Sequence, residues 1–197
     1  MRNSVLAFLL FAFSALTFSC SKTNENDYVP RPKGYNKLIL PKVQYQSLKG
    51  DYPYSFDISA YAKVLPDTVS WAEPHWIYIY YPNWKAFIQI TYKDLTKPKK
   101  KLTYLIDDAY KLAFKHQGKA SHIQDYVLTT KSGKKAGVFE LEGEVATSLQ
   151  FYISDSTKHY LRGAVYVRTA TENDSLAPII QFLKKDAIHL IETLRWK

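Results

Sequence analysis

Residues 76–92 read WIYIYYPNWKAFIQITY, and this stretch decides the fold because the two-residue period of a β-strand occurs in it twice. The first run is aromatic and β-branched and ends before Pro82. The second run divides its side chains between two faces, with Ala86, Ile88, Ile90 and Tyr92 on one and Phe87, Gln89 and Thr91 on the other. Two such runs, joined by residues 82–85, predict a β-hairpin.

Two later segments have the three- and four-residue spacing of apolar side chains that is typical of one face of an α-helix. The first is Leu102–His116, and Gly118 is a natural stop for it. The second is Leu176–Leu194, which either Asp174 or Ser175 can cap. We expect two helices, each with one apolar face to bury.

Shorter alternating runs predict the rest of the sheet. Phe56–Ile58 indicates a short first strand. Ile123–Thr129 and Val138–Leu141 predict a second hairpin. Leu149–Ile153 and Tyr160–Val167 predict a third, and the Asp and Ser residues of its connection favour a turn.

Together these elements predict an α+β fold, in which two main helices pack on an antiparallel β-sheet. The order of the elements resembles that of the PsbP/Mog1-like sandwich. The sequence has no internal repeat, and no second linker interrupts residues 34–197. We therefore expect a single globular domain over residues 34–197.

The chain begins with the pattern of a secretory signal peptide. A positive start precedes the apolar run Val5–Phe18, which is too short for a comfortable transmembrane helix. Cys20, the single cysteine, follows the run, and its setting resembles the lipobox of bacterial lipoproteins, although Thr17 stands where an aliphatic residue is usual. We expect residues 1–19 to be removed and Cys20 to be lipidated. An ordinary secreted protein with a stray thiol is the alternative.

The segment after Cys20 reads as a tether. Residues 20–33 are polar and rich in proline, with little apolar surface to bury, and such segments stay extended as spacers. The sequence thus predicts a protein that sits on a membrane through its N-terminal lipid without crossing it.

Composition narrows the classes of partner. The chain of 197 residues carries a formal net charge of +9, which suits acidic partners such as anionic headgroups, polyanions or nucleic acid. An exported lipoprotein does not normally meet nucleic acid, so we expect no nucleic-acid partner. Aromatic residues make up 15% of the chain, and amphipathic strands use them for core and rim more often than for a ligand surface.

The sequence offers few groups for catalysis, a metal or a cofactor. One cysteine excludes paired-cysteine metal sites, and the histidines lack the three- to five-residue spacing of a metal-binding helix. We expect structural or surface roles for these histidines, which are His75, His116, His122, His159 and His189. We also expect no catalytic residues, no metal and no cofactor.

Two clusters resemble catalytic groups but have simpler interpretations. Residues 155–159 bring Asp, Ser and His together, yet working triads are assembled from distant segments, so a turn is the better interpretation. Glu140, Glu142 and Glu144 alternate as on one face of a strand. A pair of carboxylates can catalyse the hydrolysis of a glycosidic bond, but a solvated strand face is the simpler explanation for these glutamates.

Two basic stretches are candidate partner-facing patches. Lys99, Lys100 and Lys101 form a tribasic stretch that can touch an anionic membrane or belong to a solvated loop. Lys158, His159 and Arg162 are the candidate second patch. Neither pattern is specific for one partner.

Several segments together resemble the GldD family of gliding motility lipoproteins of the Bacteroidota. They are Pro30–Tyr35, Ile90–Tyr92, Phe114–His116, Asp155–Ala164, Leu183–Asp186 and Glu192–Lys197. The resemblance implies a non-enzymatic cell-envelope protein that is needed for gliding and linked to the type IX secretion machinery. It also implies placement at the outer membrane, facing the periplasm, among other envelope proteins. Only Cys20 carries over from the family as a defined site.

Two functional hypotheses follow. In the first, a lipid-anchored domain binds or stabilises another protein of the gliding and secretion machinery. In the second, a surface lipoprotein binds or cleaves a glycan, which the tryptophans and the three glutamates would favour.

Overall fold

The hairpin of residues 76–92 is part of a seven-stranded sheet in which every strand pairs antiparallel with its neighbours. The structure is a computed structural model that describes residues 40–97, 101–167 and 173–197, with the side chains of residues 173–175 excepted. Across the sheet the strands are β4 (Lys63–Pro66), β5 (Ile77–Tyr81), β6 (Ala86–Asp94), β10 (His159–Val167), β9 (Thr147–Ser154), β8 (Lys135–Gly143) and β7 (Ala120–Thr129). Residues 1–39, with Cys20, lie outside the described residues, as do Lys99 and Lys100.

The three predicted hairpins are confirmed. In the first, β5 pairs with β6 with Ile79 opposite Ile88, and the 3-10 turn η1 (Pro82–Trp84) joins them. Lys85 closes this turn in the left-handed region, at a φ of 49°. Ala86, Ile88, Ile90 and Tyr92 are all buried on one face, as the alternation predicts. β7 pairs with β8, and β9 pairs with β10.

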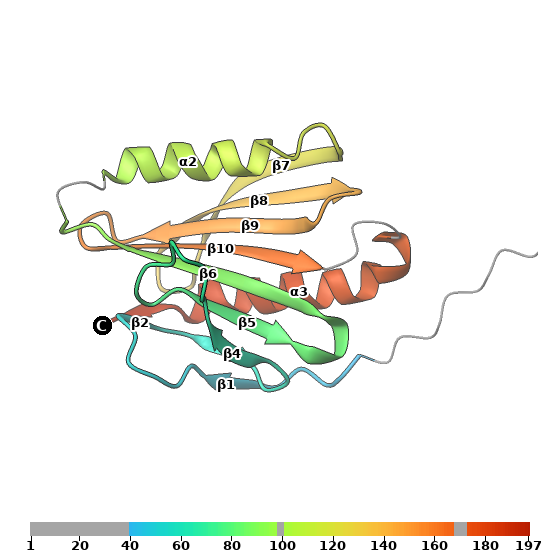
Figure 1. Ribbon diagram of the computed structural model, residues 1–197, viewed down its shortest axis with the longest axis horizontal. Coiled ribbons are helices and arrows are strands. Elements are labelled where there is room, and N and C mark those ends of the chain that lie inside the picture. Colours follow the sequence, from blue (N-terminus) through green and yellow to red (C-terminus); the bar gives the residue numbers. More distant parts are fainter. Residues whose placement is uncertain (1–39, 98–100, 168–172) are drawn as a thin grey trace, which may run out of the picture. The chain divides into compact units, whose positions relative to one another are not determined.

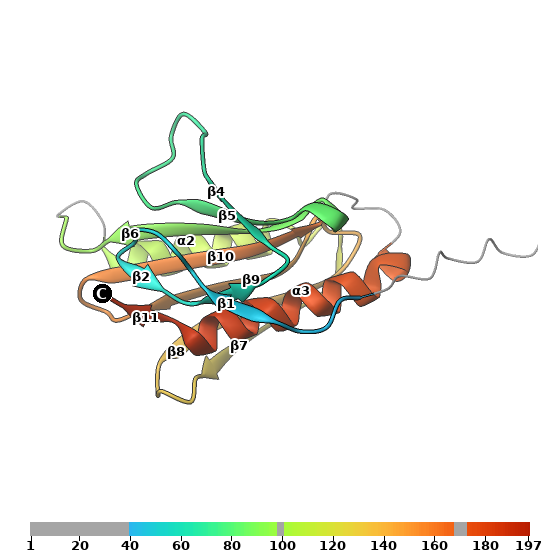
Figure 2. The same ribbon diagram turned by 90° about the horizontal axis from the view of Figure 1, so that it is seen from below.

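Both predicted helices are confirmed, and they cover opposite faces of the sheet (Figures 1 and 2). Helix α3 (Asn173–Thr193) packs on the face that holds the larger apolar core. Helix α2 (Leu102–Phe114) packs on the other face, where Ala109 and Ala113 meet Phe139 and Leu141 of β8 in a smaller cluster. No helix among the described residues is long and apolar enough to cross a membrane.

The beginning of the domain differs from the prediction. The expected strand at Phe56–Ile58 is found one residue later, as β3 (Asp57–Ser59), and Phe56 separates it from β2 (Tyr54–Ser55). These two strands pair with different partners, β2 with β11 (Arg195–Trp196) and β3 with β1 (Tyr45–Ser47). The chain therefore changes partner at Phe56, which is buried in the larger core.

The turn between β9 and β10 is the one that residues 155–159 predict. Oδ1 of Asp155 accepts hydrogen bonds from the backbone N–H groups of Thr157, Lys158 and His159, at 3.0, 2.8 and 2.9 Å. Ser156 adopts a left-handed backbone with φ of 67°. The aspartate is thus occupied as a turn acceptor rather than as a catalytic group.

One carboxylate is buried beneath α3. Asp186 is 4% exposed and accepts hydrogen bonds from the hydroxyls of Tyr45, at 3.1 Å, and Tyr81, at 2.8 Å. Burial raises the pKa of Asp186, although both hydrogen bonds act to lower it. The network ties α3 to β1 and β5 at once.

Gly163 lets a large aromatic ring lie flat on the central strand. It pairs with Phe151 of β9, and a Cβ added to Gly163 would collide with the ring of Phe151, which is fully buried. We predict that Gly163→Ala lowers the free energy of unfolding by about 1–3 kcal/mol, because the overpacked ring must move. Chemical denaturation measures this change.

Gly118→Ala is the matched control, since no atom lies within 4 Å of the Cβ that it would add. We expect a change of less than about 0.5 kcal/mol for this exposed position. Equal stability of the two variants would contradict the role assigned to Gly163.

Candidate functional site

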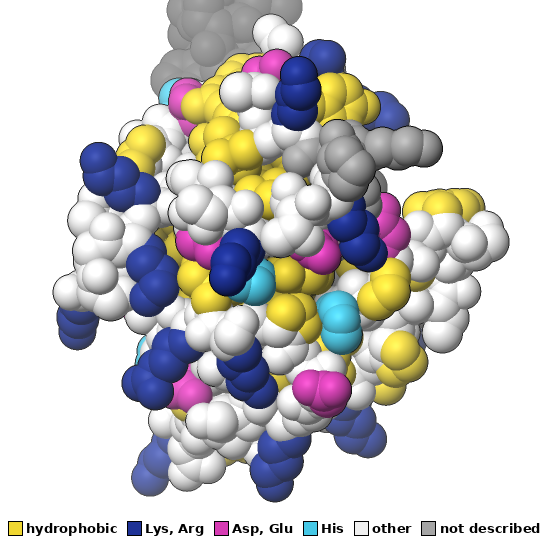
Figure 3. Space-filling model, turned by 90° about the vertical axis from the view of Figure 1, so that its left-hand side faces the viewer, with side chains coloured by type: hydrophobic (Ala, Val, Ile, Leu, Met, Phe, Trp, Pro, Cys, Tyr) yellow, Lys and Arg dark blue, Asp and Glu magenta, His cyan; other side chains and the backbone are white. Residues whose placement is uncertain are grey.

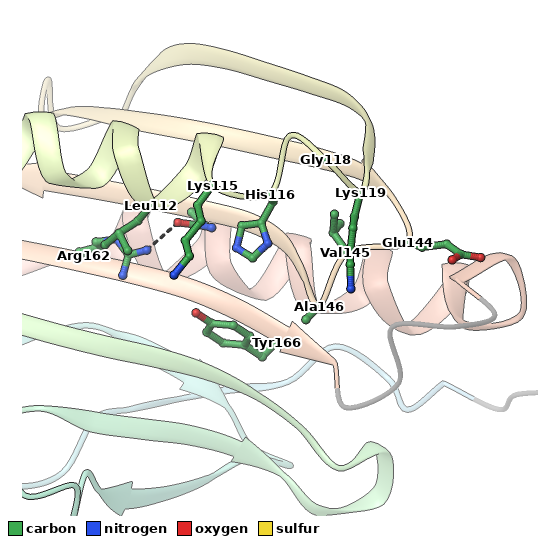
Figure 4. Close-up of a pocket in the computed structure, with 11 residues that line it drawn as sticks. Leu112, Lys115, His116, Gly118, Lys119, Glu144, Val145, Ala146, Arg162 and Tyr166 are labelled. Atoms are coloured by element: carbon green, nitrogen blue, oxygen red, sulfur yellow. Dashed lines mark hydrogen bonds between the residues drawn. The ribbon is translucent and has the colours of Figure 1, made fainter.

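A pocket of about 690 Å³ lies between the C-terminal end of α2 and the sheet (Figure 4). Its walls come from α2, the turn from α2 into β7, the connection from β8 to β9, and strands β9 and β10. The segments that meet here are far apart in the sequence, so only the fold brings them together.

The way α2 ends gives the pocket its outer wall. Ala113 is fully buried against β8, and the chain then leaves the helix in a tight turn. The carbonyl of His116 accepts the N–H groups of both Lys119 and Ala120, at 2.9 Å each. This turn directs the chain into β7 and holds Lys119 at the edge of the pocket.

Basic side chains dominate the charged lining. Lys115, His116 and Lys119 come from α2 and its turn, and Arg162 comes from β10, whereas Glu144 is the single acidic residue of the lining. In Figure 4 Lys115 and His116 project from the helix end into the gap above β10. The site therefore has the electrostatic character of an anion-binding pocket.

Arg162 is held in place from one side only. Its Nη2 donates to Oε1 of Gln150 at 2.6 Å, and the side chain of Gln150 is 1% exposed. The Nε of Arg162 is buried but has no hydrogen-bond partner among the described residues. A buried donor without an acceptor is uncommon in proteins and calls for a water molecule or a ligand.

The environment of His116 favours its neutral form. Burial lowers the pKa of His116 below its ordinary value of 6.5, and the positive charges of Lys115 and Arg162 lower it further. At neutral pH its imidazole is therefore uncharged and offers one donor and one acceptor to the pocket.

The structure separates the residues that the sequence groups as a second basic patch, so that grouping is wrong. His159 and Arg162 are three positions apart on β10 and point to opposite faces of the sheet. His159 stacks on Trp196, with ring centroids 5.1 Å apart, and its Nδ1 lies 2.7 Å from the hydroxyl of Tyr92. Arg162 faces α2 instead, and Lys158 is exposed in the turn before β10.

Lysine and arginine side chains are spread around the end of the domain where α2 begins and β9 turns into β10, rather than gathered in one patch (Figure 3). Lys101 is exposed at the start of α2 and is the described member of the predicted tribasic stretch.

The remaining histidines lie apart from the pocket. His75 has a left-handed backbone with φ of 69°, and His122 is exposed on β7. His189 stacks on Tyr45, with ring centroids 3.6 Å apart. Within the described ranges, no three His, Cys, Asp or Glu residues are grouped as a metal site would require.

The three glutamates do not form one solvated face, so that interpretation is wrong in part. Glu140 is half-buried and accepts hydrogen bonds from Lys184 Nζ, at 2.7 Å, and from the hydroxyl of Tyr126, at 2.8 Å. Burial acts to raise the pKa of Glu140, but these hydrogen bonds lower it below its ordinary value. Glu142 is exposed, and Glu144 lies beyond Gly143, where β8 ends.

Sequence reasoning found Arg162 but missed Lys115, Lys119, Gln150 and Tyr166 as its neighbours. A signal for one of the missed residues, Gln150, exists in the sequence. Gln150 and Arg162 each interrupt an apolar strand, and a polar residue inside such a run is often bonded to another one.

Comparison with known proteins identifies the class and then the family. The structure is an α+β domain with two helices on an antiparallel sheet, and the family model described as gliding motility lipoprotein GldD matches residues 25–196. The chain therefore belongs to the GldD family of gliding motility lipoproteins.

Among solved structures, the solution structure of cyanobacterial PsbP (CyanoP) from Synechocystis sp. PCC 6803 is similar, with a TM-score of 0.48 and 12% sequence identity. The similarity covers 84% of this chain and 99% of that one. No match was found among curated proteins.

The lowered pKa of His116 is directly measurable. We predict that a proton NMR titration finds the His116 imidazole half-protonated below pH 6.5, and that Lys115→Gln moves its pKa upward because a positive neighbour is removed. A pKa at or above 6.5 in the unaltered chain would contradict this description of the pocket.

The same shift has a consequence for stability. Because the pKa is lower in the folded state, the unfolded state takes up the proton first as the pH falls below about 6.5. As the pH falls from that value to the pKa of His116 in the folded state, the free energy of unfolding of the unaltered chain should decrease relative to that of His116→Gln.

Proposed function

We propose that the protein is anchored to the cell envelope by lipid on Cys20 and works as a non-enzymatic assembly or stabilising factor for the gliding and type IX secretion machinery. The observation that carries the proposal is the position of the family match, which begins at residue 25, or 25 − 20 = 5 residues after Cys20. In this proposal the protein lies at the outer membrane, on the periplasmic side.

The anchor follows from simple energetics. One acyl chain gives only marginal membrane binding, whereas several chains on one cysteine hold a protein stably at the surface. The polar and proline-rich residues 21–33 would then act as a spacer between the lipid and the domain. In this proposal residues 34–197 act as one binding module.

A non-enzymatic role is supported by the hydrogen bonds that the candidate catalytic carboxylates already accept within the fold. Oδ1 of Asp155 accepts three backbone hydrogen bonds, and Glu140 is paired with Lys184 and Tyr126. Asp186, a third carboxylate that the sequence does not single out, is buried and accepts hydrogen bonds from two tyrosines. These carboxylates hold elements of the fold together, so binding of a partner is a better account of the domain's function than hydrolysis of a substrate.

The glycan hypothesis loses its main support for the same reason. Acid–base hydrolysis of a sugar needs two carboxylates facing one another across the scissile bond. Glu140 is held in an ion pair, and Glu144 lies outside the strand that carries Glu140 and Glu142.

Replacing the lipidated cysteine tests the proposal in cells. In a strain that lacks the native protein, we expect Cys20→Ser to abolish incorporation of labelled palmitate, to move the protein out of the membrane fraction and to stop colony spreading. Quantitative mass spectrometry of the envelope should show at least one motility or secretion protein at reduced abundance.

Ser21→Ala is the matched control, because it changes the neighbouring residue and leaves the thiol intact. We expect it to label with palmitate and to restore spreading. Membrane-bound Cys20→Ser protein with normal spreading would refute the anchor, and an unchanged envelope proteome in the non-spreading strain would refute the assembly role.

A further inference from the structure

We propose that the pocket beside α2 binds a phosphate monoester, with Arg162, Lys115 and Lys119 around the phosphate and the apolar wall against the organic group. This inference goes beyond the proposed function and does not depend on the lipid at Cys20. Four observations carry it: the charge of the lining, the unpartnered donor of Arg162, the origin of that residue and the size of the cavity.

The charge of the lining matches a dianion. Lys115, Lys119 and Arg162 contribute three positive charges and Glu144 one negative charge, so the lining carries 3 − 1 = +2 with His116 neutral. A phosphate monoester carries about −1.5 to −2 at pH 7. A single carboxylate would leave one of these positive charges unmatched.

The guanidinium of Arg162 is prepared for an additional acceptor. Gln150 accepts a hydrogen bond from one of its amino groups, and the buried Nε is left without a partner. Phosphate oxygens are strong acceptors, and arginine binds them through paired, charge-assisted hydrogen bonds. A phosphate at this position would satisfy the donor after a small adjustment of the side chain.

Arg162 is the residue of the lining that a purely structural explanation does not account for. The carbonyls at a helix C-terminus attract cations, and this attraction accounts for Lys115 without any ligand. It does not account for Arg162, which comes from β10 and keeps a buried, unpartnered Nε. The strand residue is therefore the one that points to a ligand.

The cavity is larger than a bare phosphate requires. Small-molecule sites have volumes of about 300–1,000 Å³, and this pocket, at about 690 Å³, lies within that range. Leu112, Val145 and Ala146 supply apolar lining beside the cations. A short organic group attached to the phosphate would fill this part of the pocket.

Calorimetric titration with glycerol 3-phosphate tests the proposal on the full chain in non-ionic detergent. We expect Arg162→Gln to weaken binding at least tenfold and Lys115→Gln to weaken it several-fold. Glu144→Gln should strengthen binding only slightly, because Figure 4 shows its carboxylate turned away from Arg162 and Lys115.

Lys135→Gln is the matched control for charge. Lys135 is exposed at the opposite end of β8 from the pocket, so its removal should change the affinity less than twofold. Three results would each overturn the proposal: no binding by the unaltered chain, normal binding by Arg162→Gln, or an equal loss in Lys135→Gln and Lys115→Gln.

The phosphate monoester can come from a soluble molecule or from a lipid headgroup. Binding to nanodiscs that contain phosphatidic acid, absent from phosphatidylcholine nanodiscs and sensitive to Arg162→Gln, identifies the lipid source. Binding of glycerol 3-phosphate without such nanodisc binding identifies the soluble source. Equal affinity for inorganic phosphate and glycerol 3-phosphate would refute the assignment to an ester.

Discussion

The packing of α3 on one face of the antiparallel sheet is the constraint on which the rest of the structure depends. Side chains of a strand alternate between faces, so every second side chain of β10 lies on the face that α3 covers. Leu161 and Val165 are fully buried in that core, and Gly163 leaves room there for the ring of Phe151. The intervening residues of β10, Arg162 among them, must face the other side.

The other face is covered only in part, because α2 has 13 residues and packs mainly over β8 and β9. Where α2 ends, its lysines and His116 overhang the face of the sheet that carries Arg162. One face of the sheet thus supplies most of the buried apolar surface, and the other supplies a basic pocket. Two carboxylates support this division, since the buried Asp186 and the half-buried Glu140 each link α3 to a strand.

The regular elements could be predicted from the sequence, whereas their contacts across the fold could not. The hairpin of residues 76–92 and both helices have strong periods, and each is found where its period indicates. Strands β1, β4 and β11 have two to four residues, too few for a period to appear. The sequence marks Arg162 as a candidate but groups it with Lys158 and His159, although residues three apart on a strand face opposite sides of the sheet.

The division of roles between the two faces of the sheet is tested most directly by chemical denaturation of variants at two neighbouring residues of β10. Leu161→Ala should lower the free energy of unfolding by about 2–5 kcal/mol, because it opens a cavity under α3. Arg162→Gln should lower it by less, about 0.5–1.5 kcal/mol, because it removes the hydrogen bond to Gln150 but opens no apolar cavity under α3. An equal loss in both variants would contradict the account, since Arg162 would then be a structural residue.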